Sequence, residues 1–304
     1  MQKNEISAKS LNDDAVSWIE KLRQVLLIQD MGKGTVKSYA AEMILLFKYF
    51  NHKTVDSITQ PDIEQYIVYI KTVHKVGRAK CRSVASACSF FYKKVIKMPY
   101  VLPSALYPQK QFILPNIMSQ QEVIQLFAAP LSLKEYCVIG LLYGSGLRIS
   151  EVTALCVQDI ESAAKRIKVV QGKGAKDRYT LLAGNLLDKL RQYYIAAKRP
   201  PQFLFTSPQT GTAFHPRSMQ LVVTGAMQKA GFTPKGYTSH TLRHSFATHM
   251  LDNGSNIHVI KTLPGHSKLE TTMVYLHLQQ HTQFGIVSPM DKLLGGSHDT
   301  ATLK

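Results

Sequence analysis

The chain is short of cysteine, of long hydrophobic runs and of acidic side chains, and each shortage excludes a class of protein. Only four cysteines occur in 304 residues. They form no C-x-x-C pair and have no histidine at zinc-ligand spacing, which excludes a zinc ribbon or finger. So few cysteines, without a pairing pattern, favour a reducing compartment. The four are Cys81, Cys88, Cys137 and Cys156.

Long hydrophobic runs are missing as well. No uninterrupted apolar stretch approaches the length of a membrane span. Residues 1–5 are polar, and the apolar region that a signal peptide requires does not follow them. We therefore expect a cytoplasmic protein without a signal peptide and without a membrane partner.

Basic residues outnumber acidic ones, 37 against 20, and the formal net charge is +17. The excess is present in both halves of the chain and is not confined to a tail. A hydrophobic content of 45% and a charged content of 19% indicate a globular protein. A polyanion held between two basic domains fits this distribution, and nucleic acid is the first candidate. A soluble protein that is merely basic is the alternative.

The first hundred residues show the 3.6-residue periodicity of helices. Prolines at positions 99, 103, 108 and 115 then exclude one continuous helix. We predict an all-α domain over residues 1–98, followed by a linker over residues 99–115. Four helices are expected in this domain. The first covers residues 13–29, and the second runs from the break at 31–34 to Phe50. The third begins after an N-cap at Thr59, and the fourth covers 78–97.

The second half of the chain mixes helical and strand patterns, so the predicted fold class is mainly α with a small β-sheet. A capping box at Ser119-Gln120-Gln121-Glu122 marks the first helix after the linker. Two strands, 166–170 and 178–182, are joined by a hairpin loop at 172–176. Helices are expected at 119–129, 133–144, 149–155, 184–198, 217–230, 241–252, 257–263 and 268–279.

The stretch from His240 to Tyr275 concentrates the side chains most useful for chemistry. It holds three histidines near its start, then an arginine among them, His266 and the tyrosine. A second arginine, Arg148, lies far upstream in Gly-Leu-Arg-Ile-Ser-Glu. Arginine offers a planar fork of donors that matches two phosphoryl oxygens. Tyrosine supplies an oxygen nucleophile that can form a covalent intermediate. The pattern indicates an enzyme that cuts and rejoins DNA without a metal.

Each motif has a simpler interpretation when it stands alone. His240 and Arg243 would share a helix face behind an N-cap at Ser239, but so would incidental charges on a capped surface helix. Arg148 can be a helix-capping arginine paired with Glu151. Two histidines at i and i+4 suggest metal ligands, yet the glutamate of H-E-x-x-H is missing and no nearby side chain completes a ligand set. We therefore expect no metal and no cofactor.

Together, and in this order, the motifs resemble the tyrosine recombinase (phage integrase) family, and within it the Xer-like and integron-integrase-like branches. The resemblance covers nearly the whole second half, and the helical first half resembles the family's core-binding domain more loosely. One position departs from the pattern, because Pro264 stands where leucine is usual. The matching segments are 146–151, 172–174, 240–248, 265–267 and 271–275.

The resemblance implies how the phosphate is held and attacked. Tyr275 is the implied nucleophile, which leaves a 3′-phosphotyrosine and a free 5′-hydroxyl. Arg148 and Arg243 are the implied clamp on the non-bridging oxygens, where His266 adds a hydrogen bond.

The resemblance also implies how protons move. Lys173 is the implied general acid for the leaving 5′-oxygen, and His240 assists proton transfer to or from Tyr275. Glu151 is expected to orient a neighbouring basic group. Because the bond energy is kept in the protein–DNA ester, no ATP is required.

The implied architecture has two domains that close around double-stranded DNA. Residues 1–98 would be a core-binding, SAM-like domain, and residues 116–304 a catalytic domain whose tail, 276–304, packs on a neighbouring protomer. A homo-tetramer on DNA is implied, or a hetero-tetramer with a second recombinase. Two alternatives stay open: a monomeric topoisomerase of type IB with the same groups, and an architectural DNA-binding protein.

Overall fold

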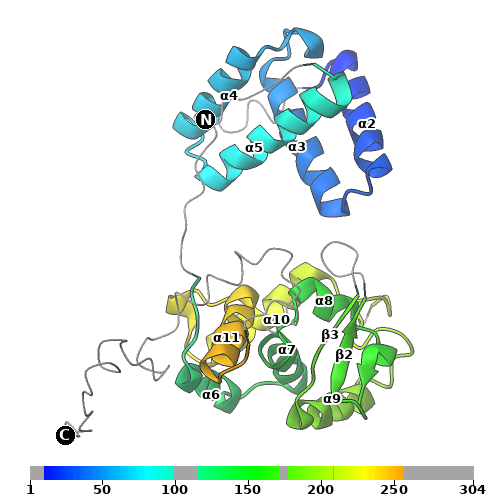
Figure 1. Ribbon diagram of the computed structural model, residues 1–304, viewed down its shortest axis with the longest axis vertical. Coiled ribbons are helices and arrows are strands. Elements are labelled where there is room, and N and C mark those ends of the chain that lie inside the picture. The colour runs from blue at the N-terminus through cyan, green and yellow to red at the C-terminus, as the bar shows by residue number, and fades with distance from the viewer. Residues whose placement is uncertain (1–9, 99–114, 171–176, 208, 257–304) are drawn as a thin grey trace, which may run out of the picture. The chain divides into compact units, whose positions relative to one another are not determined.

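The computed structural model describes residues 10–98, 115–170, 177–207 and 209–256 (Figure 1). The chain divides into two compact units, residues 1–112 and 113–304, and each is described by itself. The described residues are mostly helical with one three-stranded sheet, which confirms the predicted fold class. Within these residues, no helix combines the length and the apolar character needed to cross a membrane.

Two helices of the first unit begin at a capping side chain. The Asn12 side chain accepts the N–H of Ala15 at 2.8 Å, and the N–H of Thr59 donates to the Asp62 carboxylate at 2.8 Å. The predicted helix 78–97 is not one α-helix, because residues 91–96 are π-helical. The elements are α2 Asp13–Ile28, α3 Lys33–Tyr49, the 3₁₀ turn η1 Val55–Ser57, α4 Gln60–Thr72, α5 Arg78–Phe90 and the π-helix η2 Phe91–Ile96.

Apolar side chains from all of these helices form one core. Leu22, Phe47, Ile63 and Phe91 are fully buried in it. The rings of Phe47 and Phe91 meet edge to face, with 5.4 Å between their centroids. The first unit therefore has a hydrophobic core of its own.

The second unit is built around α7, whose residues 137–142 are all buried. It packs against α9, α10 and α11. Gly140 allows the close approach of α9, because a Cβ at this position would lie 2.5 Å from the Leu186 side chain. The helices are α6 Gln120–Ala128, α7 Leu133–Gly144, α8 Ile149–Ala154, α9 Gly184–Ala196, α10 Pro216–Lys229 and α11 Ser239–Asp252, with 3₁₀ turns η3 Val157–Asp159 and η4 Thr233–Lys235.

The sheet of the second unit is antiparallel, in the order β1-β2-β3. Both predicted strands are present as β2 Arg166–Val169 and β3 Arg178–Leu181, and β1 Ile160–Glu161 was not predicted. Ile167 pairs with Thr180 and Val169 with Arg178, so these four residues lie on one face of the sheet. That face is buried, and it points the Arg178 side chain into the protein. The predicted helices 257–263 and 268–279 lie outside the described residues.

Candidate active site

The N-cap of the helix that carries His240 and Arg243 lies one residue earlier than predicted. Thr238, not Ser239, is the N-cap of α11, because its backbone is extended and its side chain accepts the N–H of Thr241. Ser239 is the first helical residue and is buried, with its hydroxyl 3.2 Å from the Gln220 side-chain oxygen. With Thr238 as the N-cap, His240 lies in the first turn of α11.

His240 and Arg243 come from the same end of α11 but differ in exposure. His240 is exposed, and its ring lies 6.5 Å from that of His244, measured between centroids. The Arg243 side chain is only 5% exposed. Its guanidinium donates to the carbonyl oxygen of Gly146, and its Nη1 lies 3.8 Å from the Glu151 carboxylate. The buried arginine therefore joins α11 to the turn between α7 and α8.

That turn depends on a glycine. Gly146 has φ +61°, a conformation that glycine adopts without the strain of a Cβ atom. A Cβ here would also lie 2.5 Å from the ring of Phe246. The neighbouring carbonyl of Ser145 accepts the Thr180 hydroxyl at 2.6 Å, so β3 holds the turn from the other side. The Gly-Leu-Arg motif thus places Arg148 between the sheet and α11.

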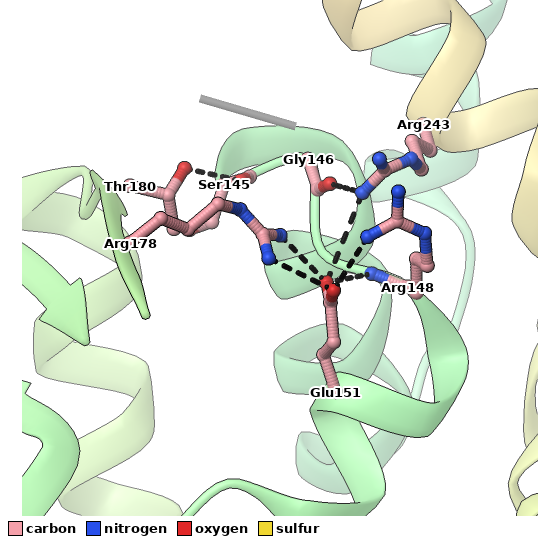
Figure 2. Close-up of polar contacts among 7 residues, drawn as sticks. All are labelled: Ser145, Gly146, Arg148, Glu151, Arg178, Thr180 and Arg243. Carbon is pink, nitrogen blue, oxygen red and sulfur yellow. Dashed lines mark hydrogen bonds and ion pairs between the residues drawn. The ribbon is translucent and has the colours of Figure 1, made fainter. Parts of the chain in front are cut away.

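Glu151 lies at the centre of the site and contacts three arginines (Figure 2). The backbone N–H of Arg148 donates to its carboxylate at 2.8 Å, and Arg148 Nη1 donates at 2.7 Å. Arg178 donates twice, from Nη1 at 3.0 Å and from Nη2 at 2.8 Å. Arg243 completes the set. Glu151 thus contacts three basic groups, and its role in orienting one of them stays a prediction.

The electrostatics of this cluster favour an anion. Burial would raise the pKa of the Glu151 carboxyl, but the hydrogen bonds from Arg178 and Arg148 and their charges hold that pKa below its usual range. The carboxylate is therefore ionised at neutral pH. Because one carboxylate faces three guanidiniums, positive charge remains in excess. The Arg148 side chain is 20% exposed and can meet a ligand from solvent.

The neighbouring histidines of α11 have different environments. Burial, together with the charges of His240 and Arg243, lowers the pKa of His244 to about 4, so His244 is neutral near pH 7. His249 is buried and hydrogen-bonds the Tyr143 hydroxyl at 3.0 Å. Across the described parts of the chain, no three His, Cys, Asp or Glu side chains are grouped closely enough to hold a metal ion.

Of the six predicted site residues, the structure places three. Arg148 and Arg243 meet at Glu151, and His240 lies in the first turn of the helix that carries Arg243. Lys173, His266 and Tyr275 lie outside the described residues. Arg178 was predicted only as part of a strand. The sequence did carry a signal for a buried ion pair of Arg178, because an arginine on the inward-facing side of a strand requires a buried partner.

Comparisons with known proteins agree on one family. Residues 115–282 match the model of the Phage integrase family, and residues 18–101 match that of the phage integrase N-terminal SAM-like domain. A tyrosine recombinase of Pseudothermotoga lettingae is 31% identical over 272 residues, which cover 86% of this chain and 94% of the relative. Tyrosine recombinase XerC of Psychromonas ingrahamii is 32% identical over 269 residues, which cover 81% and 87%.

The fold is also similar to that of solved structures. The crystal structure of the XerH site-specific recombinase bound to its palindromic difH substrate, a post-cleavage complex, matches with a TM-score of 0.69 and 17% sequence identity. The match covers 96% of this chain and 92% of that one.

Proposed function

The chain belongs to the phage integrase family of tyrosine recombinases, and we propose that Arg148 and Arg243 hold the scissile phosphate while Tyr275 attacks it. As a site-specific recombinase, it cleaves and rejoins DNA strands through a covalent 3′-phosphotyrosine intermediate. The observation that supports these roles is the convergence of Arg148 and Arg243, remote in sequence, on the buried carboxylate of Glu151.

The proposed reaction conserves atoms and charge at each step. The Tyr275 oxygen forms a bond to phosphorus, and the bond from phosphorus to the 5′-oxygen breaks. His240 accepts the tyrosine proton, and Lys173 gives a proton to the leaving 5′-oxygen. The guanidiniums of Arg148 and Arg243, with a hydrogen bond from His266, stabilise the charge on the non-bridging oxygens. Rejoining is the reverse, with a 5′-hydroxyl as the nucleophile, so no ATP is consumed.

The substrate that we propose is double-stranded DNA, bound through its phosphates. The net charge of +17 supports a large electrostatic share in the binding, which makes affinity fall steeply with salt. A DNA chosen by the protein itself supplies the site for the experiments. We use the term selected duplex for an oligonucleotide that full-length protein selects from a random-sequence pool, synthesised intact or with a single nick placed at successive positions.

Covalent trapping tests the function and the absence of a metal together. A nick close to the cleavage point releases a short fragment after attack, so the covalent complex accumulates and migrates slowly on a denaturing gel. We expect it to form at an unchanged rate in EDTA, because arginine and lysine side chains supply the positive charge. The control adds Mg²⁺ or Zn²⁺ back to the same reaction. If the complex requires an added metal, the proposed mechanism is wrong.

We further propose that four protomers assemble on two DNA sites, as identical subunits or with a second recombinase. The residues after Tyr275 include six large apolar side chains that need a surface to bury against. Each contributes about 1.5–3 kcal/mol when fully covered. They are Phe284, Ile286, Val287, Met290, Leu293 and Leu294. A neighbouring protomer supplies such a surface, and head-to-tail packing of the tail closes a ring.

Removing the residues after Leu278 tests this assembly. The truncated protein is expected to bind one selected duplex with normal affinity and to fail in pairing two. Gel shifts with DNA that carries one or two sites measure both properties, with full-length protein as the control. Normal pairing by the truncated protein would rule out an exchanged tail. Loss of single-site binding would show that the tail covers its own protomer.

A further inference from the structure

Arg178 holds the Glu151 carboxylate with two hydrogen bonds, yet it has no role in the reaction proposed above. It is the first residue of β3 and lies on the buried face of the sheet. Both of its terminal nitrogens donate to Glu151, at 3.0 and 2.8 Å, and its side chain is only 9% exposed. A guanidinium with two donors already engaged and so little exposure is poorly placed to bind a phosphate directly. Its effect must pass through Glu151.

The pattern of contacts on Glu151 is asymmetric. Arg178 binds the carboxylate as a fork, with one nitrogen on each oxygen, which is the strongest geometry between these groups. Arg148 reaches it through its backbone N–H and one guanidinium nitrogen, and Arg243 through a longer contact of 3.8 Å. Figure 2 shows Arg178 approaching from the strand side, whereas Arg148 and Arg243 lie on the other side of the carboxylate.

This asymmetry has a consequence for the phosphate. A buried carboxylate that faced only Arg148 and Arg243 would attract both guanidiniums and neutralise about half of their charge. Arg178 lies on the other side of the Glu151 carboxylate and already balances its negative charge. It also occupies the position from which an arginine can bind both carboxylate oxygens at once. The contact also fixes the start of β3 relative to the turn that carries Arg148, together with the hydrogen bond from Thr180 to Ser145.

We propose that Arg178 is a positioning residue for recombination: it holds the Glu151 carboxylate where it orients Arg148 and Arg243 toward the scissile phosphate, and it balances that carboxylate's charge. The proposal rests on the roles assigned above to Arg148 and Arg243. It predicts that Arg178 affects the rate of cleavage much more than the affinity for DNA. It also predicts that this effect requires Glu151.

A double-mutant cycle on the full-length protein tests the proposal. Arg178→Met and Arg178→Lys are made alone and together with Glu151→Gln, and the rate of covalent complex formation is measured on the nicked selected duplex. Arg178→Met is expected to slow cleavage on the order of 10- to 100-fold, the effect of removing an outer partner of a functional group. Arg178→Lys, which keeps the charge but loses the fork, should recover part of that rate.

Two further expectations separate positioning from a general structural effect. Affinity for the intact selected duplex should change by less than about threefold, because most contacts are to other phosphates. In the Glu151→Gln background, loss of Arg178 should slow cleavage by less than about threefold more, since coupled residues are not additive. The matched control is Arg166→Met, because Arg166 lies on the neighbouring strand, has a side chain that is 46% exposed, and pairs with Glu161 at 2.6 Å. Its cleavage rate should equal that of the wild type.

The outcomes that overturn the proposal differ from those that overturn the reaction scheme. A wild-type rate for Arg178→Met, or equal effects with and without Glu151, would refute positioning by Arg178. If Arg178→Met does not fold, Arg178→Lys in the two backgrounds carries the same comparison. Arg148→Ala is measured beside them. Normal cleavage by that variant would refute the arginine clamp itself, whereas its inactivity beside a normal Arg178→Met would refute only the present inference.

Discussion

Replacing Tyr275 by phenylalanine is expected to abolish the covalent DNA complex and to leave DNA affinity unchanged. The substitution removes one hydroxyl group, which is the proposed nucleophile, and keeps the ring. Removal of a nucleophile that works with several partners lowers rates by roughly 10⁴- to 10⁶-fold, well below detection in a gel assay. Phosphate contacts elsewhere on the protein should be preserved, so the intact selected duplex should bind as before.

The measurement compares the two proteins on the nicked selected duplex in a denaturing gel, and on the intact duplex in a gel shift. Tyr179→Phe is a suitable control, because Tyr179 is 42% exposed and lies on the face of β3 opposite to Arg178. This control should form the covalent complex at the wild-type rate. A covalent complex that persists in Tyr275→Phe would refute the assignment, and the nucleophile would have to be sought elsewhere.

Local sequence patterns predicted the elements whose boundaries depend on local chemistry. The capping box at Ser119 is present, with the Ser119 N–H donating to Glu122 at 2.7 Å and the Glu122 N–H donating back at 3.2 Å. Thr59 caps its helix as predicted. Both long strands were placed correctly to within one residue at each end. In each case, neighbours within a few residues decide the conformation.

Elements that depend on distant contacts were not predicted. The strand β1 has two residues and exists only because Ile160 pairs with Ile167 and Glu161 with Arg166. The helical periodicity of residues 13–29 includes Val16 and Leu27, yet these side chains are 52% and 62% exposed. Periodicity identifies the helix, but the packing of neighbouring helices decides how wide a stripe of it is buried.

The site shows the same division between local and distant causes. The pairing of Arg148 with Glu151, three residues apart at a helix start, was foreseen from the sequence. The contact of Arg178 with Glu151 was not, because it joins a strand to a helix through the tertiary fold. No sequence pattern within β3 predicts which carboxylate its arginine contacts. The resemblance to a family supplied residues with known roles, and Arg178 was not among them.

Replacing Arg243 by lysine is expected to slow cleavage by about 10²- to 10³-fold, the scale for losing one donor that stabilises charge in a transition state. Lysine keeps the positive charge, but it is a point donor without the planar fork. The Arg243 guanidinium contacts the Gly146 carbonyl and Glu151, and in the proposed clamp it must also face the phosphate. An ammonium group in the same buried position cannot reach these partners together.

The decisive comparison is between the cleavage rate and the properties that a folding defect would change. Single-turnover cleavage of the nicked selected duplex is measured together with affinity for the intact duplex and with the thermal unfolding temperature. Arg191→Lys is the control, because Arg191 pairs with Asp188 on the surface of α9 with 60% of its side chain exposed. A normally folded Arg243→Lys that cleaves at the wild-type rate would contradict the proposed clamp. A slow variant that still binds DNA would show that the fork of Arg243, and not its charge alone, stabilises the phosphate during strand cleavage.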